Sequence, residues 1–141
     1  MLKILLLLTP ILSFAMTGKF SGTGIARYAS GKVYECSEVF LNIKTTPTRF
    51  FLNEGGYICG FLQAGFDNFK MDIKEGKLFH QDQELGSIDG ESIKYSIFDP
   101  KDWSTYYFSF TKIDEKNYRY FEEWHDGEKI ALKIEGILQP H

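Results

Sequence analysis

The sequence has few of the residues from which reactive or metal-binding sites are usually built. Its 141 residues include two cysteines and three histidines. The histidines, His80, His125 and His141, are scattered and do not have the paired spacing of zinc motifs. No glycine-rich phosphate loop, Gly-x-Ser-x-Gly turn or EF-hand loop occurs. We therefore predict no catalytic set, no metal site and no cofactor.

Basic runs and long apolar runs are also missing. Sixteen Lys and Arg against nineteen Asp and Glu give a net charge of −3, and nothing resembles the clustered basic residues that bind phosphate backbones. Nucleic acid is therefore not a predicted partner. A membrane-spanning helix needs about 20 apolar residues. The run from Ile4 to Leu12 is shorter and contains Pro10, so no spanning helix is expected.

The amino-terminal segment has the pattern of a signal peptide. Lys3 precedes the apolar run, and Ser13-Phe14-Ala15 provides the small residues that a signal peptidase reads. We predict cleavage before Met16, which leaves residues 16–141 as one secreted or periplasmic domain. The alternative is a buried amino-terminal strand or helix.

The remaining sequence alternates in a period of two, with no sustained helical period. Apolar Phe69, Met71 and Ile73, for example, are separated by charged residues, which is typical of strands with one buried face. Tight turns containing Ser-Gly, Glu-Gly or Asp-Gly separate these segments. We predict about ten antiparallel strands, at 19–29, 33–45, 49–63, 66–74, 77–81, 84–89, 92–98, 103–114, 117–126 and 129–139.

The glycine pair Gly55-Gly56 decides how the two cysteines are related. If the chain turns after Pro47 and the next strand runs through the glycines, opposed residues have numbers that sum to about 95. Cys36 and Cys59 then face each other, with Cα atoms about 4.5–5.5 Å apart, and form a disulfide. If the glycines make the turn, a further strand separates the cysteines beyond bridging reach. We favour a bulge or bend at the glycines.

A meander of ten strands must curl or leave two exposed edges, and closure removes both. The predicted fold class is therefore all-β, an up-and-down meander that closes into a small barrel, with a two-layer β-sandwich as the alternative. Gly22 and Gly24 are expected to lie where the barrel closes. In strand number, size and strand order the chain resembles the calycins, which comprise lipocalins and fatty-acid-binding proteins. The first strand has Phe20 and no lipocalin tryptophan, and "ASGK" is too short for a two-helix lid.

The stretch "NYRYFEEWHDG" carries the strongest candidate for a site. On a strand, Tyr120, Glu122 and Trp124 share one face. If that face points inward, Glu122 is a buried carboxylate that needs a partner, for which Arg27 is one candidate. If it points outward, Glu122 is a solvated edge residue. Arg119 and Glu123 share the other face of the strand, and the simplest expectation for them is a surface ion pair.

Three hypotheses of function follow. The first is a binding module for a small, partly apolar or aromatic ligand. Its predicted lining is Tyr95, Tyr106, Phe108, Tyr118, Tyr120, Glu122 and Trp124. The second is an extracytoplasmic interaction or inhibitor protein that acts through rim loops near Trp103 or Phe121, without an internal ligand. The third, an enzyme that uses Glu122 with a tyrosine, ranks last.

Overall fold

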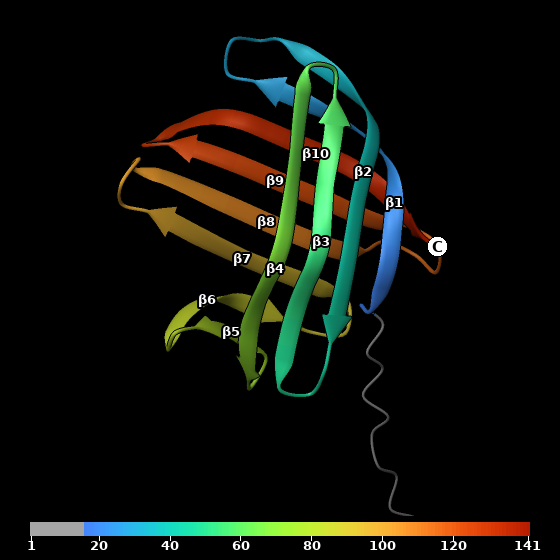
Figure 1. Ribbon diagram of the computed structural model, residues 1–141, viewed down its shortest axis with the longest axis vertical. Coiled ribbons are helices and arrows are strands. Elements are labelled where there is room, and N and C mark those ends of the chain that lie inside the picture. Colours follow the sequence, from blue (N-terminus) through green and yellow to red (C-terminus); the bar gives the residue numbers. More distant parts are fainter. Residues whose placement is uncertain (1–15) are drawn as a thin grey trace, which may run out of the picture.

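The computed structural model describes residues 16–141, apart from the side chain of Asp67. It contains the ten strands that the sequence predicts (Figure 1). Their bounds are β1 Gly18–Tyr28, β2 Val33–Thr45, β3 Arg49–Cys59, β4 Leu62–Lys74, β5 Lys77–His80, β6 Gln83–Ile88, β7 Ser92–Asp99, β8 Ser104–Lys112, β9 Tyr118–Asp126 and β10 Lys129–Pro140.

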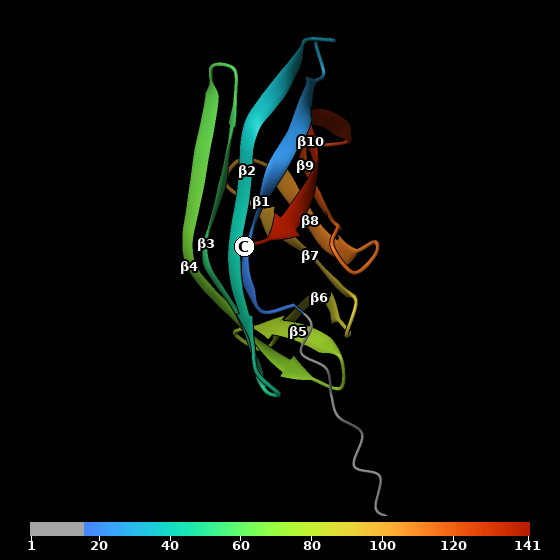
Figure 2. The same cartoon turned by 90° about the vertical axis from the view of Figure 1, so that its right-hand side faces the viewer.

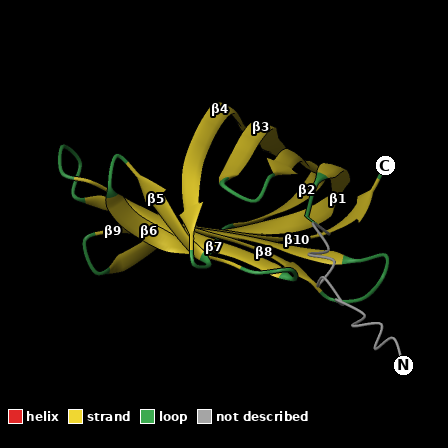
Figure 3. Ribbon diagram, turned by 90° about the horizontal axis from the view of Figure 1, so that it is seen from below, coloured by secondary structure: helices red, strands yellow, loops and turns green. Residues whose placement is uncertain are grey.

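The strands form an antiparallel ring in chain order, closed by pairing of β1 with β10. In space the barrel has two walls: β1–β4 make one wall, and β7–β10 cross it steeply on the other side (Figures 1 and 2). Seen from below, β3 and β4 stand away from the β7–β10 wall (Figure 3). The predicted closed barrel is thus confirmed over the sandwich, although its cross-section is not circular.

The glycine pair lies inside β3, and the predicted disulfide is formed. Cys36 and Cys59 are bonded across β2 and β3, with Cα atoms 3.9 Å apart, closer than expected. The register shifts twice along this pair, once between Cys36 and Glu38 and once between Asn42 and Ile43. Because the two irregularities compensate, the simple sum of residue numbers still pairs the cysteines. The bulges therefore lie beside the glycine pair, not at it.

The next turn is the one boundary that differs from the sequence prediction by more than two residues. β3 ends at Cys59 and β4 begins at Leu62, whereas the sequence suggested a strand to residue 63 and a new one from 66. Gly60 makes the turn with a φ of 63°, a left-handed conformation that glycine adopts without a steric penalty. The segment 63–65 looks turn-like because it contains Ala and Gly, but it continues the ladder with β3.

The barrel closes where two glycines of β1 meet β10. A Cβ atom on Gly22 would lie 2.0 Å from the carbonyl oxygen of Ile137, and one on Gly24 would lie 2.3 Å from that of Glu135. Only glycine permits this close approach of backbones. The predicted role of the two glycines at the closure is confirmed.

The two ends of the barrel differ in how completely their inward side chains are buried. At the end that contains the termini of the described chain, most of the inward side chains are 9% exposed or less. They include Met16, Phe20, Ile43, Phe50, Ile88, Ile93, Phe110, Tyr118 and Leu138. At the opposite rim, the inward side chains are only partly buried. They include Tyr34, Leu62, Phe66, Ile97, Tyr106 and Leu132.

The open rim continues into a gap in the backbone ladder. β4 pairs with β5 only through Asp72, Ile73 and Lys74. Within the described residues, the earlier part of β4 has a ladder partner only in β3. Here aromatic side chains bridge the two walls; the rings of Phe69 and Tyr95, for example, lie 6.1 Å apart. Along this part of β4, packing between side chains therefore joins the two walls, whereas backbone hydrogen bonds join neighbouring strands around the rest of the ring.

The predicted signal peptide, residues 1–15, lies outside the described residues. Among residues 16–141, no helix has the length and apolar character needed to span a membrane.

Candidate functional site

The alternation of β9 places Glu122 inside the barrel. Residues Tyr118, Tyr120 and Glu122 are buried in turn, and the residues between them lie on the outer face. Glu122 has no exposed surface and is the one buried charged residue of the described chain. The outward orientation, with Glu122 as a solvated edge residue, is therefore wrong.

The carboxylate of Glu122 is held by hydroxyl and indole donors. Its Oε1 atom accepts hydrogen bonds from the hydroxyls of Tyr106 at 2.8 Å and Tyr120 at 3.0 Å. Its Oε2 atom accepts one from the indole Nε1 of Trp124 at 3.0 Å. The hydroxyl of Tyr57 also interacts with this carboxylate. Such a set of donors satisfies the polar atoms of a group that would otherwise be very costly to bury.

Burial and hydrogen bonding act on Glu122 in opposite directions. Desolvation raises the pKa of the Glu122 carboxyl, while the hydrogen bonds from Trp124, Tyr106, Tyr57 and Tyr120 lower it, and the net shift is upward. The same burial, together with the nearby carboxylate, raises the pKa of the hydroxyls of Tyr57 and Tyr120. These hydroxyls therefore stay protonated as donors at neutral pH.

Two side chains of the opposite wall complete the surroundings, and the sequence analysis missed both. Tyr57 projects inward from β3, and Phe66 from β4, with their rings 6.0 Å apart. Phe66 in turn lies 6.4 Å from the ring of Tyr106. Tyr57 has the same strand parity as Cys59, so its inward orientation followed from the disulfide. Its contact with Glu122 of β9, on the other side of the barrel, could not be inferred from the disulfide.

The seven predicted lining residues all face inward, but they do not form one site. Tyr106, Tyr120, Glu122 and Trp124 form the hydrogen-bonded cluster. Tyr95 and Phe108 stack on each other at 4.8 Å between the ring centroids, next to the cluster: Phe108 contacts Tyr120 at 5.6 Å and Tyr95 lies 6.3 Å from Tyr106.

Tyr118 lies elsewhere, because it stacks on Phe110 at the closed end, with centroids 5.2 Å apart. It is a core residue, separated from the open rim by the layers that contain Tyr120 and Glu122 on the same strand. The prediction that each of these side chains contacts a ligand remains a prediction.

The proposed charged partners of this region are different in the structure. Arg27 is exposed on the outer side of β1, because residues of its parity point away from the core, so it does not neutralise Glu122. Glu123 pairs with His125 on the outer face of β9, rather than with Arg119. Phe121, expected near a rim, lies within β9 under the ammonium of Lys133.

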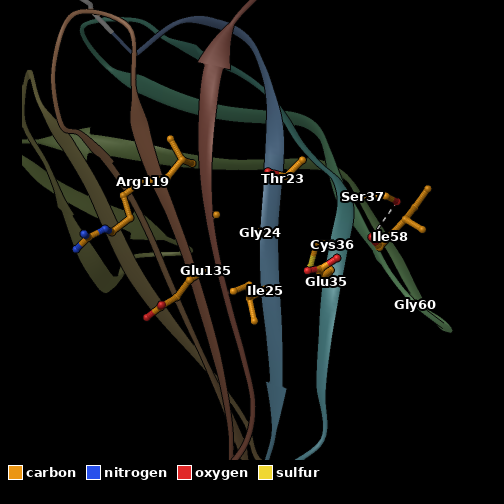
Figure 4. A pocket seen from close by; sticks show the side chains of 12 residues that line it. Thr23, Gly24, Ile25, Glu35, Cys36, Ser37, Ile58, Gly60, Arg119 and Glu135 are labelled. Atoms are coloured by element: carbon orange, nitrogen blue, oxygen red, sulfur yellow. Dashed lines mark hydrogen bonds between the residues drawn. The ribbon is translucent and has the colours of Figure 1, made fainter.

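A large hollow lies on the outer wall of the barrel (Figure 4), and Glu122 is not among the residues that line it. It has a volume of about 1100 Å³ and is lined mainly by β1, β2 and β10, with Ile58 of β3 and Arg119 of β9 at its edges. Its floor contains Gly24 and Gly136, and Ile25, Glu35 and Arg119 contribute to its lining. The small residues let the sheet coil sharply here, which makes a shallow depression. None of the seven predicted residues lines it.

A smaller hollow of about 410 Å³ lies over β6–β8 and is bordered by Tyr95 and Phe108. Both side chains are buried, so the accessible part of this hollow belongs to neighbours such as Lys94 and Tyr107. The volumes of these two hollows therefore do not point to the candidate site. The buried carboxylate of Glu122 does.

Aromatic side chains are also exposed at the turns of the open rim. Trp103, in the β7–β8 turn, is 71% exposed and contacts the ring of Phe98 at 5.8 Å. Phe61, at the β3–β4 turn, is 98% exposed. The predicted rim position of Trp103 is what the structure shows.

No protein-family model matches the sequence, and no curated protein matches it. Seven chains of known structure match the fold. One is a redesigned β-barrel, with 8% sequence identity and a TM-score of 0.47, covering 92% of this chain and 95% of that chain. Another is the protein EF1p2_mFAP2b bound to DFHBI, with 12% identity and a TM-score of 0.47, covering 92% and 99% of the two chains.

Proposed function

We propose that this protein is an exported binding protein that holds a small, partly apolar ligand at the open rim of the barrel, over Glu122. The observation that carries the proposal is the Glu122 carboxylate, which is fully buried directly beneath the partly exposed Trp124 and Tyr106. A barrel that needed only a packed core would be more stable with an apolar residue at this position. A polar group retained one layer below a half-open aromatic rim is the arrangement of a ligand site.

Export is supported by the disulfide between Cys36 and Cys59, because such bonds persist in oxidising compartments. Binding, rather than catalysis, is supported by the partners of Glu122. They are tyrosine hydroxyls and an indole, all donors, and a general acid or base must instead exchange protons with a substrate within reach.

The two tryptophans of the chain, Trp103 and Trp124, give a direct test. A Trp103→Phe variant reports only Trp124 at the Glu122 site, and a Trp124→Phe variant reports only Trp103 at the rim turn. Both are titrated with the neutral fluorescent probe N-phenyl-1-naphthylamine. We expect quenching of Trp124 emission by energy transfer to the probe, with saturation at one site, and a much smaller change at Trp103.

The second candidate is a protein that binds partners through its rim turns, supported by the exposed aromatic rings of Trp103, Phe98 and Phe61. Exposed aromatic residues of this kind are typical anchors of protein interfaces. In the same experiment, a response of Trp103 without a response of Trp124 would favour this candidate. The absence of any saturable probe binding in either variant would overturn the proposed ligand site.

A further inference from the structure

The charge of Glu122 has no cationic partner within the described chain. None of the ion pairs among residues 16–141 includes Glu122, and its hydrogen-bond donors are neutral side chains. Neutral donors satisfy the carboxylate oxygens but leave a net negative charge inside the barrel. A buried charge of this kind is stabilised most by an ion of opposite sign in direct contact.

Aromatic rings surround the place where such an ion would approach. The rings of Tyr106 and Trp124 lie 4.7 Å apart, beside the carboxylate. Phe66 faces Tyr106 from the opposite wall at 6.4 Å, with Tyr57 next to it at 6.0 Å. Because the faces of aromatic rings carry partial negative charge, a group of several rings attracts ammonium ions. The rings and the carboxylate thus favour the same sign of charge.

The buried carboxylate of Glu122 lies next to side chains that are partly exposed. Glu122 is fully buried, but Trp124, two residues further along β9, is partly exposed and donates to Oε2. Oε1 accepts hydrogen bonds from two tyrosines, Oε2 accepts one from the indole of Trp124, and the hydroxyl of Tyr57 also interacts with the carboxylate. An ammonium group at Oε2 would therefore take the place of the hydrogen bond from Trp124, whose side chain is partly exposed.

We infer that the ligand is a protonated amine attached to an aromatic or apolar body, with its ammonium group placed against Oε2 of Glu122 and beside the rings of Tyr106, Trp124 and Phe66. This inference rests on the proposed function and specifies its ligand class. The apolar body would lie toward the open rim, where the partly buried Phe66, Ile97 and Leu132 provide apolar contact.

Three probes with the same indole body separate charge from shape: tryptamine is cationic, tryptophol neutral and indole-3-propionate anionic. Calorimetric titration of the disulfide-bonded protein at neutral pH is expected to rank tryptamine first, about tenfold or more tighter than tryptophol. Indole-3-propionate should bind most weakly, because its carboxylate is repelled by Glu122.

A Glu122→Gln variant is expected to bind tryptamine and tryptophol equally. The matched control is Glu123→Gln, which makes the same change of net charge on the outer face of the same strand, where Glu123 pairs with His125. The control should keep the preference for tryptamine. If Glu122→Gln does not fold, as judged by circular dichroism, Phe66→Leu replaces it. That variant should weaken tryptamine binding more than tryptophol binding, so that the tryptamine preference falls while both probes still bind.

The outcomes separate this inference from the proposed function. Equal binding of the three probes overturns the amine inference and leaves the ligand site in place. A tryptamine preference that persists in Glu122→Gln, or that is undiminished in Phe66→Leu where that variant is used, also overturns it, because the charge or ring that selects the amine must then lie elsewhere. No binding of any indole probe, together with no response to N-phenyl-1-naphthylamine, overturns the proposed function itself.

Discussion

At the scale of single residues, Glu122 illustrates how a carboxylate can be kept inside a β-barrel without a cation. Its donors come from β3, β8 and β9, so the hydrogen-bonded cluster joins the two walls across the interior. Each bond contributes modestly, but removal of the acceptor would leave several buried donors unsatisfied, which costs about 1–3 kcal/mol for each group. The cluster therefore fixes both the rotamers of the tyrosines and the spacing of the walls.

The raised pKa of the Glu122 carboxyl predicts a specific dependence of stability on pH. A folded-state pKa above the unfolded value of 4.5 means that the folded protein holds the proton more tightly. The contribution of Glu122 is then fully present below pH 4.5 and is lost as the pH rises through the folded-state pKa. The loss is at most about 1.4 kcal/mol for each pH unit between the two pKa values.

The measurement is urea unfolding, followed by circular dichroism, of the wild type and of Glu122→Gln between pH 4 and pH 8. The difference between their free energies of unfolding isolates Glu122 from other carboxyls such as Asp89 and Asp114, whose pKa values are lowered. We expect the wild type to lose stability relative to the variant as the pH rises. A gain instead would show that the four donors outweigh desolvation.

At the scale of elements, the β3–β4 hairpin depends on an asymmetry between two facing glycines. Gly56 and Gly65 are directly opposed in the ladder. A Cβ atom on Gly56 would lie 2.4 Å from the carbonyl oxygen of Ala64, whereas one on Gly65 would have no neighbour closer than 3.8 Å. The same residue type is thus required on one strand and optional on the other.

Alanine substitution at each glycine should therefore have opposite effects on the free energy of unfolding. Gly56→Ala forces backbone atoms apart and is expected to destabilise the protein by about 1–3 kcal/mol. Gly65→Ala reduces the freedom of the unfolded chain and should be neutral or stabilising by up to about 1 kcal/mol. Thermal unfolding of the two variants, side by side with the wild type, checks the contrast, and similar losses in both would contradict it.

At the scale of the whole molecule, the disulfide links the wall of β1–β4 close to its open rim. It joins residues separated by 23 positions, on strands that are already neighbours. The chain-entropy argument assigns such a link a stabilisation of about 3 kcal/mol, through restriction of the unfolded state. The Glu122 cluster lies on the other side of the same interior. The disulfide and the cluster therefore both stabilise the barrel near its open rim.

A Cys36→Ala, Cys59→Ala double variant is accordingly expected to be about 3 kcal/mol less stable in urea unfolding. The slope of the unfolding free energy with urea concentration should increase, because the unlinked chain exposes more surface when it unfolds. Wild-type protein unfolded with a thiol reductant should behave like the double variant. A loss well below 1 kcal/mol would indicate that the β2–β3 hairpin persists in the unfolded state.

What the sequence determined by itself is local. Period-two alternation and turn residues define the ten strands, and short connections oblige consecutive strands to pair. The pairing of Cys36 with Cys59 followed from counting residues on either side of a turn. The inward face of β9 was correctly delimited as a set, because strand alternation keeps residues of one parity together.

Only the tertiary structure decided which side chains meet across the barrel. Tyr57 and Phe66 lie near Glu122, whereas Tyr118 lies at the closed end. Both positions depend on how steeply the two walls cross. The position of Arg27 outside the barrel depends on the register at the closure with β10. These relations arise from sheet coiling and closure, which sum small contributions from every strand, so no local pattern in the sequence encodes them.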